Sequence, residues 1–594
     1  MSKKKARWRK LDNAAKLYSA ASNKKDTRVF RFYCELKEEV NPDVLQEALN
    51  QTIETFPTFL MVLRKGLFWH YLEPCNLRPI VKEEYKEPCS RLYIKDKKTL
   101  LFEVTYYKKR INFEVFHVLT DGTGATEFLK ELVKNYLYLI HKVNGLEPVS
   151  LLPEDMTVQD QEVDSFLKYY SKDQKRPKKR KLHAFQIRRK KKDGNHLHVH
   201  ESVVSVQAVL KRSRELGVSM TVFLTVLFMM AINEEMSKMQ KKKPVVLMVP
   251  VNLRKFFPSL SMLNFFNWIE PGYNFTTQDQ SFEAILKYTK EFFDTELTKE
   301  KMSAHISELL ALELKNLCIQ AGAKYSEKNT TAIFSNMSAV KIHASYVPYI
   351  ERFGVYTNTP KFELCLCSFQ DKLSFAFTSR YDTVNIERNF YRLLKEQGIA
   401  SEKVKPEFPK TDEPSEQEMK VYKIYSFLCI AIVAAMLVTE YNFHPRIRWT
   451  LFTAGGVVTM WIASSIGFFK RYNLLKNAMW QLFIGTIICF IWDALTGWHS
   501  WSVDLVLPIM SVSTLTAMFV TAKVRKCPVR EYLIYEIMAA GYGLILPGIL
   551  LLCKVVKNPT VSMFGALICF LFLVAVILFK GREFKEEMQK NLHV

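Results

Sequence analysis

The stretch His117-Val118-Leu119-Thr120-Asp121-Gly122 joins an alternating, strand-like run (residues 111–116) to a helix-like run (residues 125–133). A histidine at the end of a strand, followed by a glycine-containing turn, is well placed to project its imidazole into a cleft. Near neutral pH that imidazole can take a proton from a hydroxyl or an amine. His117 is therefore a candidate general base. A buried core histidine beside a turn is the alternative interpretation, and residues farther along the chain decide between the two.

Three later stretches supply further polar residues at the ends of strand-like runs. An apolar run (residues 245–253) ends at Arg254, and a short loop leads from it to Asn264 and Phe265. A third run (residues 332–337) carries the pair Ser335-Asn336.

In this order, the stretches resemble the signatures of the chloramphenicol acetyltransferase/condensation-domain superfamily, which includes alcohol acetyltransferases. The shared patterns are H-x-x-x-D-G, a "P-V-x-L-R" strand, an "N-F" pair and an "S-N-x-G" strand end. The chain departs from the family at Phe116, where many members carry the first of two histidines, and at Ala339, assigned here to the place of a usual glycine. Together the landmarks span nearly all of residues 1–400.

The resemblance implies a fold and a set of roles. The fold class is a two-lobed α/β (α+β) CoA-dependent acyltransferase, with donor and acceptor entering a tunnel from opposite faces. His117 is the implied general base, Asp121 and Arg254 form a structural ion pair, and Gly122 permits the turn. Implied oxyanion donors are Ser335, Asn336 or a backbone N–H, and Asn264 is a further site residue. Acyl-CoA is the implied co-substrate, and no permanently bound cofactor is expected.

Composition separates the chain into two unlike regions. The 594 residues carry a formal net charge of +24, yet 48% of them are hydrophobic. Before about residue 420 the chain is mixed and charged, and after it long apolar stretches alternate with short basic loops. The chain is too long for one ordinary core. The predicted divisions are an N-terminal lobe at 1–170, a basic crossover linker at 171–195, a C-terminal lobe at 196–400, a linker at 401–419 and a membrane domain at 420–594.

Cysteine and histidine spacing gives no support for a metal site. The 11 cysteines form no Cys-x-x-Cys pair, and Cys365 and Cys367 alone lie two apart, on one face of a strand. This pattern is typical of reduced thiols in the cytoplasm. His196, His198 and His200 share one strand face, but ligands about 6.5–7 Å apart along a strand seldom converge on one ion. We predict no bound metal.

Six apolar segments are each close to the roughly 20 residues that a helix needs to cross a bilayer. A basic N-terminus with no apolar signal core gives the large domain no export route of its own. Basic loops fall on the side shared by both termini, which predicts a multi-pass cell-membrane protein with both termini and residues 1–419 in the cytoplasm. The segments cover residues 421–439, 449–469, 477–497, 503–521, 533–553 and 560–579. An all-α six-helix transmembrane domain is therefore expected after the transferase.

Charges in and near the spans leave two questions open. Asp493 lies near the end of the third predicted span, where it is either hydrated or part of a lipid or transport site. The basic stretch 172–192 is interpreted as a solvated linker attracted to anionic lipid, and nucleic acid is not an expected partner.

The predicted function is membrane-bound acyl transfer from a CoA thioester to a hydroxyl or amine. The acceptor is expected to be a lipid, a lipid-linked saccharide or an alcohol, because the transferase is fused to a membrane domain. Two alternatives remain: a degenerate transferase domain that serves as a binding or scaffold module, and a transporter with a cytoplasmic domain that modifies its cargo.

Overall fold

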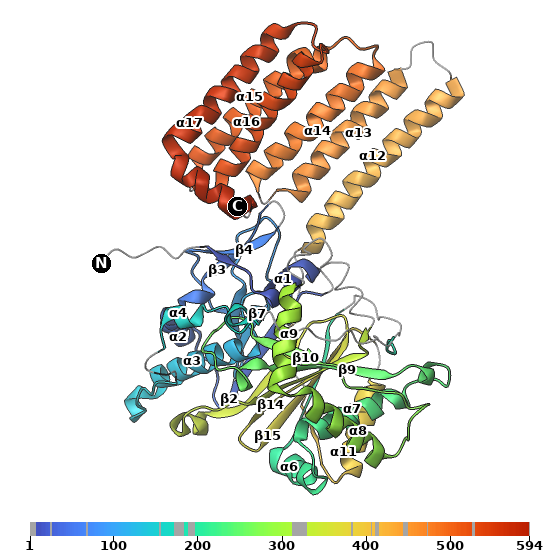
Figure 1. Ribbon diagram of the computed structural model, residues 1–594. Coiled ribbons are helices and arrows are strands. Elements are labelled where there is room, and N and C mark those ends of the chain that lie inside the picture. The colour runs from blue at the N-terminus through green and yellow to red at the C-terminus, as the bar shows by residue number, and fades with distance from the viewer. Residues whose placement is uncertain are drawn as a thin grey trace. The chain divides into compact units, whose positions relative to one another are not determined.

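The computed structural model describes residues 8–23, 26–66, 69–151, 153, 156–171, 183–187, 196–311, 329–381, 384–404, 407–409, 415–443, 449–471, 473–525 and 529–592 (Figure 1). Most of the predicted basic linker (172–182 and 188–195) lies outside these residues. The chain divides into two compact units. The first comprises Met1–Leu63, His70–Ile94 and Lys98–Asp412, and the second Arg64–Trp69, Lys95–Lys97 and Glu413–Val594.

A five-stranded sheet with two long helices forms the first lobe of the first unit. Its strand order is β13-β2-β7-β6-β5. The same part of the chain also forms a small three-stranded sheet of order β1-β4-β3. Helix α2 begins at Pro42, a residue suited to the first helical position, and the Asn41 side chain caps its N-terminus. The elements are β1 (Arg9–Lys10), α1 (Asn13–Ala21), β2 (Val29–Leu36), α2 (Pro42–Thr55), β3 (Met61–Lys65), β4 (His70–Pro74), β5 (Lys82–Glu83), β6 (Phe102–Tyr107), β7 (Arg110–Phe116), α3 (Gly122–His141), α4 (Val158–Gln161) and α5 (Ser165–Lys168).

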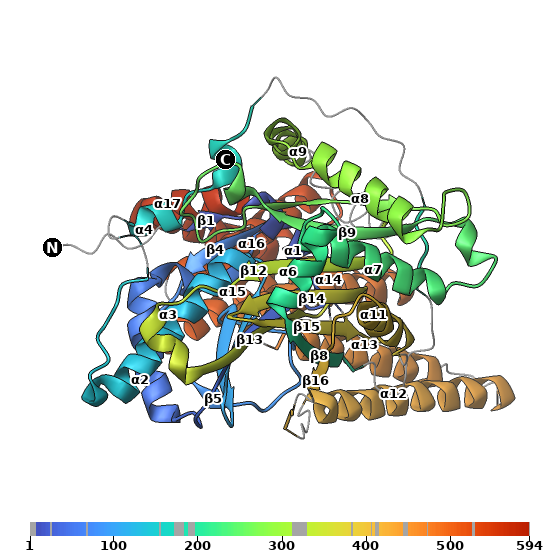
Figure 2. The same cartoon turned by 90° about the horizontal axis from the view of Figure 1, so that it is seen from below.

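An eight-stranded sheet forms the second lobe. Its order is β10-β9-β12-β14-β15-β8-β16, with β11 paired to β9. Helices α7, α8 and α11 lie along this sheet (Figure 2), and their apolar side chains belong to its core. The elements are β8 (His198–Ser205), α6 (Val206–Glu215), α7 (Met220–Glu234), β9 (Val245–Asn252), β10 (Phe266–Ile269), β11 (Gly272–Tyr273), α8 (Phe282–Glu296), α9 (Lys299–Ala311), β12 (Ala332–Ala339), β13 (Ile350–Thr357), β14 (Phe362–Phe369), β15 (Lys372–Ser379), α11 (Asn385–Glu396) and β16 (Glu402–Val404).

The two lobes are joined by an exchanged strand and by a shared sheet face. Strand β13 belongs to the second half of the sequence, yet it pairs antiparallel with β2 in the first lobe's sheet. On β14, Leu364 and Leu366 face the core of the second lobe, whereas Cys365 and Cys367 belong to the core of the first. The side-chain period of two on a strand explains this division. The predicted fold class, a two-lobed α/β unit followed by a helical domain, is confirmed.

In the described part of the second unit, six helices are long and apolar enough to cross a membrane, with mean hydropathies of 1.5–2.9. Helices α6 and α7 of the first unit also pass this test as a pair, but they meet at 89°, and α7 is buried in the second lobe's core. The six helices are α12 (Ser415–Phe443), α13 (Trp449–Phe469), α14 (Leu474–Leu495), α15 (Leu507–Val524), α16 (Val529–Leu552) and α17 (Pro559–Leu592).

Two buried carboxylates of this unit bind nearby backbone. Asp493 accepts hydrogen bonds from His499 N (2.8 Å), from Ser502 N (3.0 Å) and from Ser502 Oγ (2.7 Å). Asp504 accepts from Lys557 N (3.1 Å) and Asn558 N (3.0 Å), just before α17. Asp493 is buried, so the expectation that it is hydrated is wrong, and these hydrogen bonds hold the residues that follow α14 and those that precede α17.

Candidate active site

His117 lies at the end of β7, and three aromatic rings surround it. Its backbone N–H donates to Arg28 O (2.9 Å), which continues the pairing of β7 with β2. Its imidazole centroid is 4.3 Å from that of Tyr18, 4.7 Å from Phe30 and 5.4 Å from Phe266. Because this apolar shell disfavours the imidazolium, it lowers the pKa of His117 to about 4. The imidazole is therefore neutral at pH 7, as a general base must be.

Asp121 caps α3 and uses both carboxylate oxygens. Its Oδ1 accepts from Thr123 N (3.0 Å) and Gly124 N (3.1 Å), at the helix start, where backbone N–H groups otherwise lack partners. Its Oδ2 accepts from Arg254 Nη1 (2.7 Å) and Phe265 N (2.8 Å). The carboxylate thus joins the first lobe's motif to a loop of the second lobe.

Arg254 organises that loop. Its Nη2 donates to Ser261 O and to Leu263 O, both at 2.8 Å. The guanidinium therefore bridges Asp121 and the backbone on either side of Met262. Both charged side chains are almost completely buried, with 11% of the arginine and 4% of the aspartate exposed.

Asn264, held in the loop ordered by Arg254, contacts the imidazole directly. Its Oδ1 lies 3.1 Å from His117 Nδ1. Its Nδ2 donates to Asp12 Oδ2 (3.0 Å), and Asp12 caps α1. The structure therefore brings His117, Asp121, Arg254 and Asn264 together, as the sequence patterns predicted.

Strand β12 reaches the motif through a residue that the sequence patterns did not single out. A Cβ on Gly122 would lie 2.7 Å from Met337 Sδ, so Met337 packs against the start of α3. The Asn336 amide donates to Thr221 Oγ1 (3.1 Å) and accepts from Ser338 N (2.8 Å). Ser335 is buried on the same strand. Ser335 and Asn336 thus lie on the strand that adjoins the motif, and they remain candidate oxyanion donors.

One sequence assignment on this strand is wrong. Ser338, not Ala339, occupies the fourth position of the S-N-x-G pattern, and its φ of 66° is in the left-handed region that favours glycine. The expected role of Gly122, to permit the turn, also differs from what the structure shows. The positive-φ glycines of the described chain do not include it, so the turn does not depend on a left-handed conformation at Gly122, which instead packs against the flexible end of Met337.

Gly124, two positions on, is the more tightly enclosed glycine. A Cβ there would lie 2.1 Å from Thr120 Oγ1 and 2.7 Å from the backbone carbonyl oxygen of Met262. We expect Gly124→Ala to lower the free energy of unfolding by about 1–3 kcal/mol through overpacking. Gly122→Ala is the matched control, because the flexible end of Met337 can move away from the new methyl. Denaturant unfolding of both variants measures the difference, and equal stabilities would contradict the close approach at Gly124.

Two residues of the site, Asp12 and Tyr18, were not identified from the sequence. Both come from α1 and its N-cap. The available signal was Asp12-Asn13 before a weakly apolar helical segment, a pattern that predicts a helix start but no functional role.

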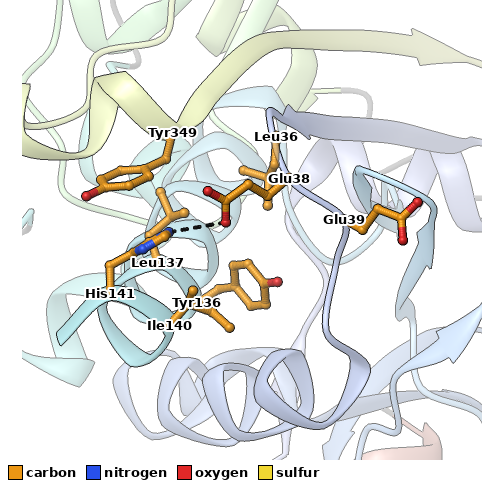
Figure 3. A pocket seen from close by; sticks show the side chains of 8 residues that line it. All are labelled: Leu36, Glu38, Glu39, Tyr136, Leu137, Ile140, His141 and Tyr349. Atoms are coloured by element: carbon orange, nitrogen blue, oxygen red, sulfur yellow. Dashed lines mark ion pairs between the residues drawn. The ribbon is translucent and has the colours of Figure 1, made fainter. Parts of the chain in front are cut away.

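A small pocket elsewhere in the first lobe is not part of this site (Figure 3). It has a volume of about 50 Å³ and lies between His141, Tyr136, Tyr349 and Glu38. His141 ends α3, 19 residues after Gly122, which places it about 28 Å along the helix from the motif. The volume is close to that of one or two water molecules.

Two histidines in this part of the chain, His200 of β8 and His196 just before it, each contact a glutamate. His200 Nδ1 lies 2.9 Å from Glu387 Oε1, and His196 pairs with Glu87. Among the residues that the structure describes, no group of three or more His, Cys, Asp or Glu side chains is arranged to hold a metal ion.

Comparison with known proteins gives a partial family match and a likeness of fold. A model described as "Family of unknown function (DUF6320)" matches residues 408–594. No curated protein matches the chain.

Solved structures similar to this chain cover 66% of it. They include the TRI3 trichothecene 15-O-acetyltransferase from Fusarium sporotrichioides (10% identity, 94% of that chain, TM-score 0.45). The first condensation domain of the CDA synthetase is another (14%, 96%, 0.47), and so is the starter condensation domain of rhizomide synthetase RzmA, as a mutant in complex with C8-CoA and Leu-SNAC (13%, 93%, 0.45). At these identities and TM-scores, no activity and no residue's role passes from them to this chain. The chain is therefore a two-lobed α/β protein similar to acyltransferase and condensation-domain structures over its first two-thirds, with six candidate membrane spans after it.

Proposed function

We propose that this chain is a membrane-attached acyltransferase that moves an acyl group from a CoA thioester to a hydroxyl or amine of a membrane-associated acceptor. The observation that carries the proposal is the neutral, aromatic-enclosed His117, whose Nδ1 faces Asn264 Oδ1. An amide oxygen accepts and cannot donate, so the Nδ1 proton is held there and Nε2 keeps its lone pair. Nε2 is thus the basic atom.

In the proposed reaction, His117 Nε2 takes the proton of the acceptor as its oxygen or nitrogen attacks the thioester carbonyl carbon. The carbonyl π electrons move to oxygen, giving a tetrahedral oxyanion. When the carbonyl re-forms, the C–S bond breaks, and the departing thiolate takes the proton back from His117. The products are the acylated acceptor and free CoA thiol, and the histidine returns to its neutral state.

The oxyanion requires a hydrogen-bond donor, for which Ser335 and Asn336 of β12 are proposed. Their strand adjoins the motif through Met337, which packs against Gly122. One such donor contributes about 3–4 kcal/mol to transition-state stabilisation in other acyl-transfer enzymes. Asp121 and Arg254 act indirectly, by fixing the loop that carries Asn264.

The acceptor is proposed to be a lipid, a lipid-linked saccharide or a long-chain alcohol. The support for this class is the fusion of the transferase-like unit to six helices long and apolar enough to cross a membrane. We further propose the cytoplasmic orientation of residues 1–419, which rests on the distribution of basic loops.

The test uses the full chain, purified in detergent and reconstituted in lipid vesicles. Acetyl-CoA and longer acyl-CoAs are supplied with lipid, sugar or alcohol acceptors, and release of the CoA thiol is followed together with acceptor mass. We expect thiol release that depends on a membrane-associated acceptor and a matching gain of one acyl group. Absence of release with every donor and acceptor would favour a non-catalytic binding module. Release that also occurs with water-soluble acceptors alone would remove the membrane-acceptor assignment.

A further inference from the structure

Helix α1 (Asn13–Ala21) and its N-cap act on His117 through two residues that lie outside the family-like motifs, one directly and one through Asn264. Its N-cap, Asp12, is 5% exposed and reaches His117 through Asn264. Its second turn brings Tyr18 against the imidazole, with an interplanar angle of 30°. The two contacts act on different properties of His117, because Tyr18 restrains the ring plane and Asp12 acts on the amide that faces Nδ1.

The orientation of the Asn264 amide follows from Asp12. Asp12 Oδ1 accepts from Ala15 N (2.7 Å), and Oδ2 accepts from Asn264 Nδ2 (3.0 Å). An ionised carboxylate only accepts hydrogen bonds, so the amide must present its NH₂ group to Asp12. The amide oxygen is then the atom that faces His117. Because that oxygen only accepts, Nδ1 must be the protonated ring nitrogen.

We propose that Asp12 is a positioning residue that sets the tautomer of His117 through Asn264. The carboxylate fixes the amide, the amide fixes the proton on Nδ1, and Nε2 remains free to act as the base. This inference rests on the proposed function for its catalytic consequence, but its structural content, the tautomer of His117, is independent of any substrate.

Charged groups around Asp12 act on it in opposite directions. Burial, with a smaller contribution from the nearby Asp164, raises the pKa of Asp12 to about 7, against the lowering effect of the hydrogen bonds from Ala15 N and Asn264 and of the Arg9 charge. The pKa of His117, about 4, is well below this value. Protonated Asp12 can donate, and the amide is then free to turn its NH₂ group towards Nδ1. We therefore expect wild-type kcat to fall as the pH falls through about 7, while His117 itself is still neutral.

Asp12→Asn separates this role from support of the fold. Asparagine is as good an N-cap as aspartate, so α1 keeps its cap through the new residue's oxygen. Its NH₂ group then faces Asn264, which must turn its own oxygen towards it and its NH₂ group towards His117 Nδ1. The expected result is a protonated Nε2 and a fall in kcat of about 100-fold or more, of the kind seen when a triad carboxylate is replaced by its amide. KM for acyl-CoA and the unfolding midpoint should remain close to wild type.

The matched control is Asp371→Asn in the second lobe. Asp371 likewise accepts from a backbone N–H (Gln207, 2.8 Å) and from a side chain (Ser205 Oγ, 2.8 Å). The substitution removes the same charge and alters a similar pair of hydrogen bonds at an exposed position, and kcat and its pH profile should be unchanged.

The deciding measurement is the tautomer of His117 in the full chain, labelled with ¹⁵N-histidine and assigned by the signal that is missing from His117→Phe. At a pH well above 7, where Asp12 is ionised, we expect the Nδ1–H form in wild type and in Asp371→Asn, and the Nε2–H form in Asp12→Asn. An unchanged tautomer in Asp12→Asn would overturn the proposal, whether or not kcat falls. If wild type transfers no acyl group but the tautomer reverses as described, the proposed function fails and the role of Asp12 stands.

Discussion

Replacing His117 by phenylalanine is expected to reduce acyl transfer by about 10³-fold, within the 10²–10⁴-fold that a general base typically contributes. Phenylalanine keeps an aromatic ring between Tyr18, Phe30 and Phe266 but has no basic nitrogen. The fold should therefore be retained. Thiol release from acyl-CoA by the full chain in vesicles measures the rate, and circular dichroism and the unfolding midpoint measure the fold.

His117→Ala adds a comparison that phenylalanine alone does not provide. It removes the same base but also leaves a void in the aromatic shell, so its rate should match that of His117→Phe while its stability is lower. His200→Ala is the control for loss of a histidine, because His200 is held by Glu387 on β8 and should leave the rate unchanged. Turnover near the wild-type rate in His117→Phe would show that another group is the base.

The sequence was sufficient for the fold class and for the membrane helices because both depend on local patterns. Alternation in residues 111–116 predicted β7, and the pair Asn41-Pro42 is a local start signal of the same kind for α2. Each apolar segment after residue 420 carries its own length and hydropathy, which are properties of a single helix.

The sequence did not predict which strands pair with each other, since period-two alternation identifies a strand but not its neighbour in the sheet. Strand β13 is followed by β14 and β15 of the second lobe, yet it completes the first lobe's sheet against β2. Nothing in the composition of residues 350–357 distinguishes that outcome from a place beside β14. The pairing of β13 with β2 is determined only when the two lobes fold together.

Site residues could be predicted from the sequence where the family resemblance specified them. They could not be predicted where a single long-range contact gives a residue its place in the site. Arg254 was predicted as the partner of Asp121, and the structure has them 2.7 Å apart across 133 positions of sequence. Asp12 is 252 positions from Asn264, and its pattern indicated only a helix start. The tight enclosure of Gly124 likewise depends on Met262 O, which no local pattern reveals.

Loss of Arg254 is expected to be the most destabilising single change in the site. In Arg254→Ala, Asp121 remains buried without its counter-charge, and the carbonyls of Ser261 and Leu263 lose their donor. Breaking a buried ion pair by removing one partner costs about 3–5 kcal/mol. Denaturant unfolding of the full chain, followed by tryptophan fluorescence, measures the loss. Acyl transfer should fall as well, because the loop that holds Asn264 against His117 is no longer fixed.

Three further variants show whether the ion pair itself is responsible. Arg392→Ala removes an arginine whose bonds to Glu234 are exposed, and it should cost less than about 1 kcal/mol. Arg254→Lys keeps the charge but cannot reproduce a planar fork that bonds one carboxylate and two carbonyls, so it should be only partly stabilising. In Arg254→Ala/Asp121→Asn the stranded charge is gone, and the double variant should be less destabilised than the sum of the two single changes. Additive losses in the double variant would mean that Arg254 supports the loop through its carbonyl contacts and that its charge contributes nothing to holding Asp121. Equal losses in Arg254→Ala and Arg392→Ala would mean that Arg254 does not support the loop at all.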